Sequence, residues 1–382
     1  MQVTKLKVCV VPLFIVLLAV LGCDVIQIGI EAPVGETTPG LETTNVPVVS
    51  LTQPGLTPSL TPVLPTTMVT PPPTEAVIPA SSGGWRNIGL EGVLVNDLAI
   101  DPWTLTTLYA GTNIGVFKST DKGVTWRQAN NGLIDTHVLS LEIAPTTDPT
   151  VPNTLYAGTH DSGVYKSVDG GESWSDANIG LIVTGVHDLA IDPTPPGTIY
   201  AATQAGMFKS IDEGMSWTEI ASARGEYLAV AIDPLTPMTL YSVDCCGISK
   251  TTDGFESSVH IDLSYTRTFT LAINRFTPST LYLGTTDGVI ISTDGFQSWT
   301  DTGLKGNSVF TLLFDPKASS TIYAGTLDNG VFKTMDDGRS WSEINVGLTI
   351  PNVRVLMIDP LTPSSLYAGT DGGGVFFLSE YQ

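Results

Sequence analysis

Short runs of alternating apolar and polar residues fill the chain from about residue 82 to its end. The first clear unit holds four such runs, at residues 95–100, 107–112, 116–119 and 126–129. Each run is rich in Val, Ile, Thr or aromatic residues, and Asp, Gly or Pro separates one from the next. This pattern predicts strands and turns. No segment after Gly84 keeps a helical spacing of apolar residues, so we predict an all-β domain.

One phrase, Thr-Leu-Tyr-Ala-Gly-Thr at residues 107–112, returns six times in related form. Its tyrosines are 47, 44, 41, 41, 41 and 44 residues apart, at Tyr109, Tyr156, Tyr200, Tyr241, Tyr282, Tyr323 and Tyr367. This period is typical of a four-stranded propeller blade. The last unit lacks a fourth strand, but residues 82–90 around Trp85 match residues 338–348 around Trp341. We therefore predict a seven-bladed β-propeller over residues 82–382, closed by the N-terminal strand in the last blade.

A second phrase, Ser/Thr-x-Asp-x-Gly-x-Ser/Thr-Trp, lies between the third and fourth strands of a unit. Its aspartates are Asp121, Asp169, Asp212 and Asp336, with less regular copies at Asp253 and Asp294. Asp can accept hydrogen bonds from nearby backbone N–H groups, Gly can take a positive φ, and Trp can cover the hairpin. Each copy offers fewer carboxylates than a calcium loop needs. A structural turn is the favoured interpretation, and a calcium ligand is the competing one.

The two phrases, recurring in register, resemble the Asp-box or bacterial neuraminidase repeat. Families built from such blades include sialidases, xyloglucan-cleaving endoglucanases, sortilin-type receptors and photosystem II stability and assembly factors. The resemblance implies that the six aspartates are structural. It also implies two classes of function. One is a glycoside hydrolase related to the xyloglucanases or, with less support, a sialidase; the other is a noncatalytic receptor or assembly module.

Two segments precede the predicted propeller. Residues 1–22 place Lys5 and Lys7 before an apolar run and resemble a bacterial lipoprotein signal, which implies lipidation of Cys23. The alternative is an uncleaved anchor over residues 8–30. Residues 31–84 contain eleven prolines and eleven threonines, so we predict that residues 23–81 form a disordered stalk. The propeller is therefore expected to be exported to the cell envelope and tethered to a membrane by lipid, facing the periplasm or the exterior.

Charge and cysteine content narrow the range of partners. The formal net charge is −21, or −23 without Lys5 and Lys7, which disfavours nucleic acid and anionic lipid surfaces as partners.

Of the four cysteines, only Cys245 and Cys246 belong to the predicted propeller. In an oxidising compartment this adjacent pair could form a vicinal disulfide, with a reduced pair or a metal contact as alternatives. Because the sequence has no CxxC or histidine-rich spacing, it predicts no metal site, and it indicates no cofactor.

Candidate binding residues gather near the starts of the innermost strands, where propellers usually present functional loops. They are Asp97, His137, His187, Asp188, Arg224, Tyr227, Arg267 and Arg354. A glycosidase would need a carboxylate pair, such as Asp97 with Asp188, about 5 to 10 Å apart. The xyloglucanase resemblance also implies a cleft between two propellers, and this chain encodes one. We therefore favour a monomeric, noncatalytic module that binds a protein, peptide or glycan, with a glycoside hydrolase as the alternative.

Overall fold

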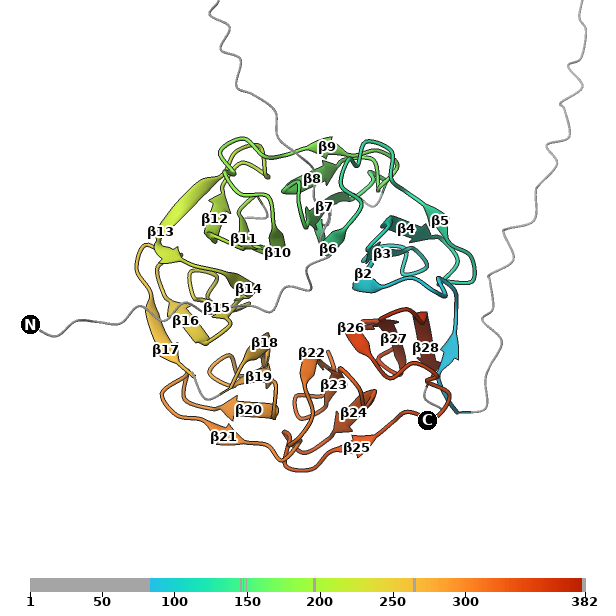
Figure 1. Cartoon of the computed structure of the whole chain (residues 1–382), viewed down its shortest axis with the longest axis vertical. Helices are drawn as coiled ribbons and strands as arrows, with labels where there is room; N and C mark the ends of the chain where they lie inside the picture. The colour runs from blue at the N-terminus through green and yellow to red at the C-terminus, as the bar shows by residue number, and fades with distance from the viewer. Residues whose placement is uncertain are drawn as a thin grey trace, which may run out of the picture. The chain divides into compact units, whose positions relative to one another are not determined.

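The computed structural model describes residues 83–379, except positions 145, 147, 149, 195, 196, 264 and 265, and only the backbone of residues 221–224. The described strands form seven four-stranded antiparallel sheets. The sheets stand around a common axis as blades, each with one strand near the axis and one at the rim (Figure 1). The predicted signal, Cys23 and the whole of the predicted stalk lie outside the described residues. Within the described residues, no helix is long and apolar enough to span a membrane.

Blades 1 to 7 are numbered by their innermost strands: β2 (Val95–Ile100), β6 (Val138–Ala144), β10 (Val186–Ile191), β14 (Tyr227–Ile232), β18 (Thr268–Ile273), β22 (Val309–Phe314) and β26 (Val353–Ile358). The second strands are β3 (Leu108–Thr112), β7 (Thr154–Thr159), β11 (Ile199–Thr203), β15 (Leu240–Asp244), β19 (Leu281–Thr285), β23 (Ile322–Thr326) and β27 (Ser365–Thr370). The third strands are β4 (Gly115–Ser119), β8 (Val164–Ser167), β12 (Gly206–Ser210), β16 (Gly247–Thr251), β20 (Gly288–Ser292), β24 (Val331–Thr334) and β28 (Gly374–Ser379). The outermost strands are β5 (Arg127–Gln128), β9 (Ser175–Asp176), β13 (Thr218–Arg224), β17 (Val259–Asp262), β21 (Thr300–Asp301), β25 (Ser342–Glu343) and, in blade 7, β1 (Arg86–Asn87).

The predicted closure of the ring is confirmed. The short strand β1 pairs with β28, with Arg86 opposite Phe377 and Asn87 opposite Phe376. The indole Nε1 of Trp85 donates a hydrogen bond to the Ile344 carbonyl at 2.6 Å, which ties this end of the chain to blade 6. The start of the propeller therefore supplies the strand that the last blade lacks, and the edge of β28 is covered.

The hydrophobic core is divided among the interfaces between neighbouring blades. At the first interface, Tyr109 of blade 1 packs with Val138 and Leu141 of blade 2, and six further clusters join the other pairs of blades. The Tyr109 hydroxyl donates to the carbonyl of Gly170 in blade 2 at 2.9 Å. Lys118 Nζ lies 5.5 Å from the centroid of the Tyr109 ring and donates to the same carbonyl at 2.7 Å. The repeated tyrosine thus joins each blade to the next.

The six repeat aspartates form tight turns between the third and fourth strands. Asp294 shows the pattern: its Oδ1 accepts hydrogen bonds from the Ser298 N–H at 3.0 Å and the Ser292 hydroxyl at 2.8 Å, and its Oδ2 accepts one from the Ser298 hydroxyl at 2.6 Å. Equivalent bonds hold the other five turns. These bonds to the charged carboxylate, first those from Ser298, lower the pKa of Asp294. We call these segments the aspartate turns.

The tryptophan after an aspartate turn reaches further than the predicted covering of its own hairpin. Trp174 Nε1 donates to the Ala129 carbonyl of the preceding blade at 2.8 Å, and Trp217 Nε1 donates to the Ala177 carbonyl at 2.7 Å. These two indoles therefore link neighbouring blades by hydrogen bonds, whereas the Nε1 atoms of Trp299 and Trp341 have no hydrogen-bond partner among the described residues. The periodicity located these tryptophans, but the contact across the interface depends on how adjacent blades pack.

Replacing Asp294 with alanine is expected to lower the midpoint of thermal unfolding by about 2–4 °C, since it removes the acceptor of four hydrogen bonds in the turn. Circular dichroism during heating would measure the change. The exposed Asp328, in the turn between β23 and β24, provides the control, and its replacement by alanine should leave the midpoint within about 1 °C. An equal loss in both variants would contradict a structural role for the aspartate turn.

Candidate functional site

A bulge near the start of every innermost strand sets one residue per blade apart from the regular pairing. In β2 the pairing passes from Val95 directly to Asp97, and the same shift occurs in the other six innermost strands. A bulge leaves one residue unpaired and re-aims its side chain. The residues skipped in this way are Asn96, Leu139, His187, Leu228, Phe269, Phe310 and Arg354, all partly exposed. We call them the axial ring, since the innermost strands surround the axis (Figure 1).

In blades 5, 6 and 7, the residues of the axial ring contact one another and form a continuous row. The rings of Phe269 and Phe310 stack with centroids 4.4 Å apart and an interplanar angle of 16°. The guanidinium of Arg354 lies 4.9 Å from the Phe310 centroid, and that of Arg267 lies 5.7 Å from the Phe269 centroid. Arg354 Nη2 also donates to Asp371 Oδ2 at 3.0 Å. We call Arg267, Phe269, Phe310 and Arg354 the arginine–phenylalanine row.

Each arginine of the row has one N–H donor that no acceptor among the described residues uses. Within the described part of the chain, the Nε atoms of Arg267 and Arg354 are buried and have no hydrogen-bond partner. A buried donor without an acceptor costs free energy, and an incoming acceptor can recover it when the arginine side chain turns to expose the N–H group. Guanidinium groups bind carboxylates with well-defined geometry, and the stacked rings beside them offer apolar area. The row is therefore suited to a ligand that carries a carboxylate or carbonyl next to an apolar group.

The other half of the axial ring is used more by the protein itself. Asn96 Nδ2 donates to the Val138 carbonyl at 2.8 Å, and His187 Nδ1 lies 2.8 Å from the Tyr227 carbonyl. His137, just before β6, stacks on His160 with centroids 5.0 Å apart. Burial, and then the neighbouring charge of His160, lowers the pKa of His137. The hydrogen bonds of Asn96 and His187 join neighbouring blades. His137 and His160 form a separate stacked pair.

Three carboxylates on the innermost strands interact with one another. Asp97 Oδ2 accepts the Leu141 N–H of blade 2 at 2.7 Å, and Asp188 Oδ2 accepts the Val230 N–H of blade 4 at 2.9 Å. Burial raises the pKa of both aspartates to about 7. For Glu142, burial and then the charges of Asp97 and Asp188 raise the pKa well above its ordinary value. Both aspartates thus bond neighbouring blades, which is a structural use of the pair proposed for glycoside chemistry.

The structure separates the sequence-predicted site residues. Arg267 and Arg354 are joined by the two stacked phenylalanines. The other four residues make contacts elsewhere: His137, His187, Asp97 and Asp188. The Tyr227 ring is 5% exposed in the core between blades 3 and 4, so it is not part of the surface. The side chain of Arg224 lies outside the described residues. Cys245 and Cys246 lie in the turn between β15 and β16, with their sulfur atoms 3.0 Å apart.

Sequence reasoning missed Phe269, Phe310, Glu142 and Asp371. For the two phenylalanines a signal was present. Each is the second residue of its innermost strand, and in the aligned repeats this position carries Asn, Leu, His, Leu, Phe, Phe and Arg. A position that varies this widely, directly after one that carries Val in five of the seven strands, can be read as one freed from the blade's packing. Glu142 and Asp371 had no such signal, since each matters through a residue distant in the sequence: Glu142 through the charges of Asp97 and Asp188 on other blades, and Asp371 through its contact with Arg354.

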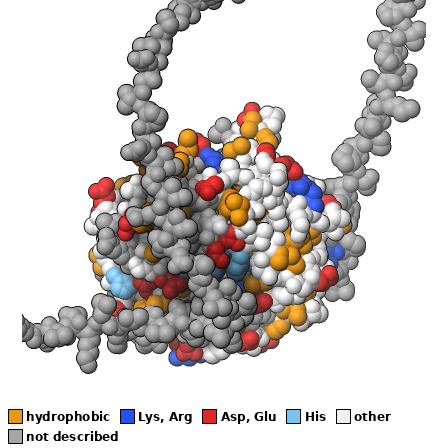
Figure 2. Space-filling view, turned by 45° about the horizontal axis from the view of Figure 1, so that its top comes forward, with side chains coloured by type: hydrophobic (Ala, Val, Ile, Leu, Met, Phe, Trp, Pro, Cys, Tyr) orange, Lys and Arg blue, Asp and Glu red, His pale blue; other side chains and the backbone are white. Residues whose placement is uncertain are grey.

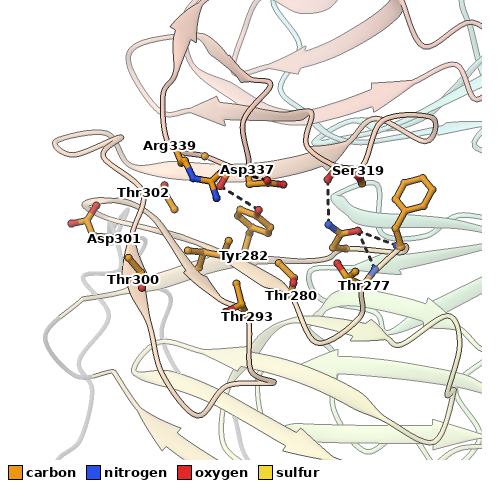
Figure 3. A pocket seen from close by; sticks show the side chains of 14 residues that line it. Thr277, Thr280, Tyr282, Thr293, Thr300, Asp301, Thr302, Ser319, Asp337 and Arg339 are labelled. Carbon is orange, nitrogen blue, oxygen red and sulfur yellow. Dashed lines mark hydrogen bonds and ion pairs between the residues drawn. The ribbon is translucent and has the colours of Figure 1, made fainter.

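A pocket lies between blades 5 and 6, beside an aspartate turn. In five blades a lysine lies 5.3 to 5.5 Å from the repeat tyrosine. Blade 5 has Ile291 opposite Tyr282 instead. The pocket there measures about 520 Å³, compared with about 380 and 310 Å³ for two similar pockets that keep the lysine. Tyr282, Asp337 and Arg339 lie around it with several threonines (Figure 3).

Comparison with known proteins places the fold but not a family. No family model matches the chain. Over 49 residues, 13% of this chain and 6% of the relative, it is 39% identical to a xyloglucanase of Hypocrea jecorina (strain QM6a). The chain thus covers a small part of that relative.

Solved structures share the propeller at low sequence identity. The GH74 xyloglucanase from Xanthomonas campestris matches with a TM-score of 0.63 and 16% identity, over 78% of this chain and 54% of that one. YCF48 from Cyanidioschyzon merolae matches with a TM-score of 0.58 and 13% identity, over 78% of this chain and 98% of that one. A structure of YCF48 bound to D1 peptide matches with a TM-score of 0.62 and 15% identity, over 79% and 99%. The chain is a seven-bladed β-propeller that spans about half of the xyloglucanase.

Proposed function

We propose that the propeller is a noncatalytic binding module that takes up a segment of another protein at the arginine–phenylalanine row. The observation that carries this proposal is the row itself. Three blades jointly present two guanidinium groups and two stacked rings, in which both Nε donors are without an acceptor among the described residues. A peptide with a carboxylate beside an apolar side chain complements this surface in both charge and shape.

Two further facts support a binding role. The similar YCF48 propeller, covered almost completely by this chain, has been solved with a bound peptide. The protein is acidic overall, and the visible face carries acidic side chains among uncharged and some basic ones (Figure 2). A basic row on an otherwise acidic protein can orient an anionic group toward one place. We further propose that the lipid on Cys23 and the Pro/Thr-rich stalk tether this module to a membrane of the cell envelope.

The test is to pan a random peptide library with free carboxyl termini against the full chain. Peptides that pair a carboxylate with an apolar residue should be selected. Their affinity should fall about 30-fold in the variants Arg354→Gln and Phe310→Ala, because arginine and aromatic anchors carry most of the energy of such contacts. Fluorescence anisotropy with a selected peptide measures the change.

The matched control is Arg127→Gln on β5, since Arg127 is also an arginine paired with a carboxylate, that of Glu172. Its affinity for the selected peptide should not change. Peptides that bind all three variants equally, or a library that gives no binder above background, would overturn the assignment of the row as a peptide site.

A glycoside hydrolase is the second candidate, favoured by the 49-residue stretch that is 39% identical to part of a xyloglucanase. Its weak point is that Asp97 and Asp188 each accept backbone N–H groups of a neighbouring blade. Release of reducing sugar from xyloglucan by the full chain, lost in the variants Asp97→Asn and Asp188→Asn, would overturn the noncatalytic proposal. A glycan that binds without turnover would instead direct attention to the threonine-rich pocket of blade 5.

A further inference from the structure

Blade 4 departs from the repeat at the turn between its second and third strands. In the other six blades the second strand ends in a threonine whose hydroxyl donates to the carbonyl of the glycine at, or directly before, the start of the third strand. These threonines are Thr112, Thr159, Thr203, Thr285, Thr326 and Thr370. Blade 4 has Asp244 at this position, and its Oδ1 accepts the N–H groups of Cys246 and Gly247, both at 2.8 Å.

Two more exchanges in blade 4 make room for polar groups beside this turn. Ser249 occupies the position that carries Phe, Tyr or Ile in the third strands of the other blades. The buried ring of Tyr227 stands where the other innermost strands begin with Val or Thr. Ser249 is thus smaller than the residues at its position in the other third strands, and Tyr227 is larger than the residues at its position in the other innermost strands. Ser249 Oγ lies 3.2 Å from Nδ1 of His260 on the neighbouring strand β17.

Together the exchanges gather sulfur, nitrogen and oxygen donors at one end of the β15–β16 hairpin. A carboxylate oxygen of Asp244 and the sulfur atoms of Cys245 and Cys246 all lie within 4.8 Å of one another. His260 lies outside this group of three, with its Nδ1 3.7 Å from Asp244 Oδ2. The carboxylate and imidazole side chains are 21% and 43% exposed, so ions in solvent can reach them.

We propose that Asp244, Cys245, Cys246 and His260 bind a thiophilic divalent cation of the zinc class. Two thiolates, one imidazole and one carboxylate make up a four-coordinate set of the kind Zn²⁺ takes. Zinc–sulfur bonds of about 2.3 Å in tetrahedral geometry require sulfur atoms ~3.8 Å apart. The two sulfurs, now 3.0 Å apart, must therefore separate slightly, and the imidazole must turn toward the ion.

Sequence spacing predicted no metal here, because the cysteines are adjacent and His260 lies further along the chain. The set forms only when β17 pairs with β16, which places His260 opposite Ser249. Binding requires both thiols to be reduced, since a vicinal disulfide would remove two of the four donors.

The experiment titrates the reduced full chain with Zn²⁺ against a chromophoric chelator. The wild-type chain should bind one equivalent more than the double variant Cys245→Ser/Cys246→Ser; Cys9 and Cys23 are present in both, so they cancel in the difference. His260→Ala should weaken this binding about tenfold or more. The matched control is His160→Ala, a histidine in the corresponding turn of blade 2 that also contacts an aspartate, and it should leave this binding unchanged.

A second variant keeps the test independent of folding. Asp244→Thr restores the residue of the other six blades, so it should fold and yet bind zinc more weakly by about tenfold or more. Zinc should raise the unfolding temperature of the wild-type chain but not of the cysteine variant, because it stabilises only the state that binds it. Equal zinc binding by the wild-type chain and the cysteine variant would overturn the proposal. So would a chain whose two cysteines resist reduction as a stable disulfide.

Discussion

Replacing Trp85 with alanine is expected to lower the free energy of unfolding by about 3–5 kcal/mol, the range for removing a large buried aromatic side chain. Trp85 is 4% exposed and packs with Tyr323 and Val353 at the interface of blades 6 and 7. It anchors β1, which has only two residues paired with β28. The variant should also aggregate more readily, since the edge of β28 becomes available when β1 detaches. Urea unfolding followed by circular dichroism measures the loss.

Trp103→Ala is the control for the closure experiment. Trp103 lies between β2 and β3 and is 49% exposed, so its replacement should cost about 1 kcal/mol or less. If the two tryptophan variants lost the same stability, the closing strand would not be what holds the ring together.

Replacing Glu142 with glutamine is expected to stabilise the protein by about 1–3 kcal/mol at about pH 8, because the change removes a partly buried charge near Asp97 and Asp188. A carboxyl whose pKa is raised on folding binds its proton more tightly in the folded state. The wild-type chain should therefore gain stability as pH falls through the raised pKa of Glu142, and the gain should level off near the ordinary pKa. The advantage of the variant should accordingly disappear by about pH 5.

Thermal unfolding of both chains between about pH 5 and pH 8 measures the effect. Asp97 and Asp188, whose pKa values are about 7, should leave part of the same pH dependence in the variant. Glu343→Gln on β25 is the matched control, because Glu343 is exposed, and it should change stability little at any pH. A Glu142→Gln variant that is less stable than the wild type at high pH would show that the carboxylate has a favourable partner.

Most of the fold could be predicted from the sequence, because a propeller is built from local units that repeat. The spacing of the seven tyrosines set the number of blades, and the match between the segments around Trp85 and Trp341 predicted the closing strand. The aspartate turns could also be predicted from the sequence. Their hydrogen bonds run between residues at most four apart, so a short phrase such as Asp294 to Ser298 contains the whole interaction.

The candidate sites were decided by the tertiary structure, since their contacts run between blades and strands whose relative placement no periodicity specifies. Phe269, Phe310 and Arg354 became one row only because three bulged strands meet near the axis. The sequence placed Asp97 and Asp188 correctly on their strands. Only the structure shows that each carboxylate accepts a hydrogen bond from a backbone N–H group of a neighbouring blade. Likewise, His260 joins Asp244 and the two cysteines through pairing of β16 with β17. By itself the sequence determined the blades and their turns, whose interactions are short-range; only packing determined which side chains of different blades face one another.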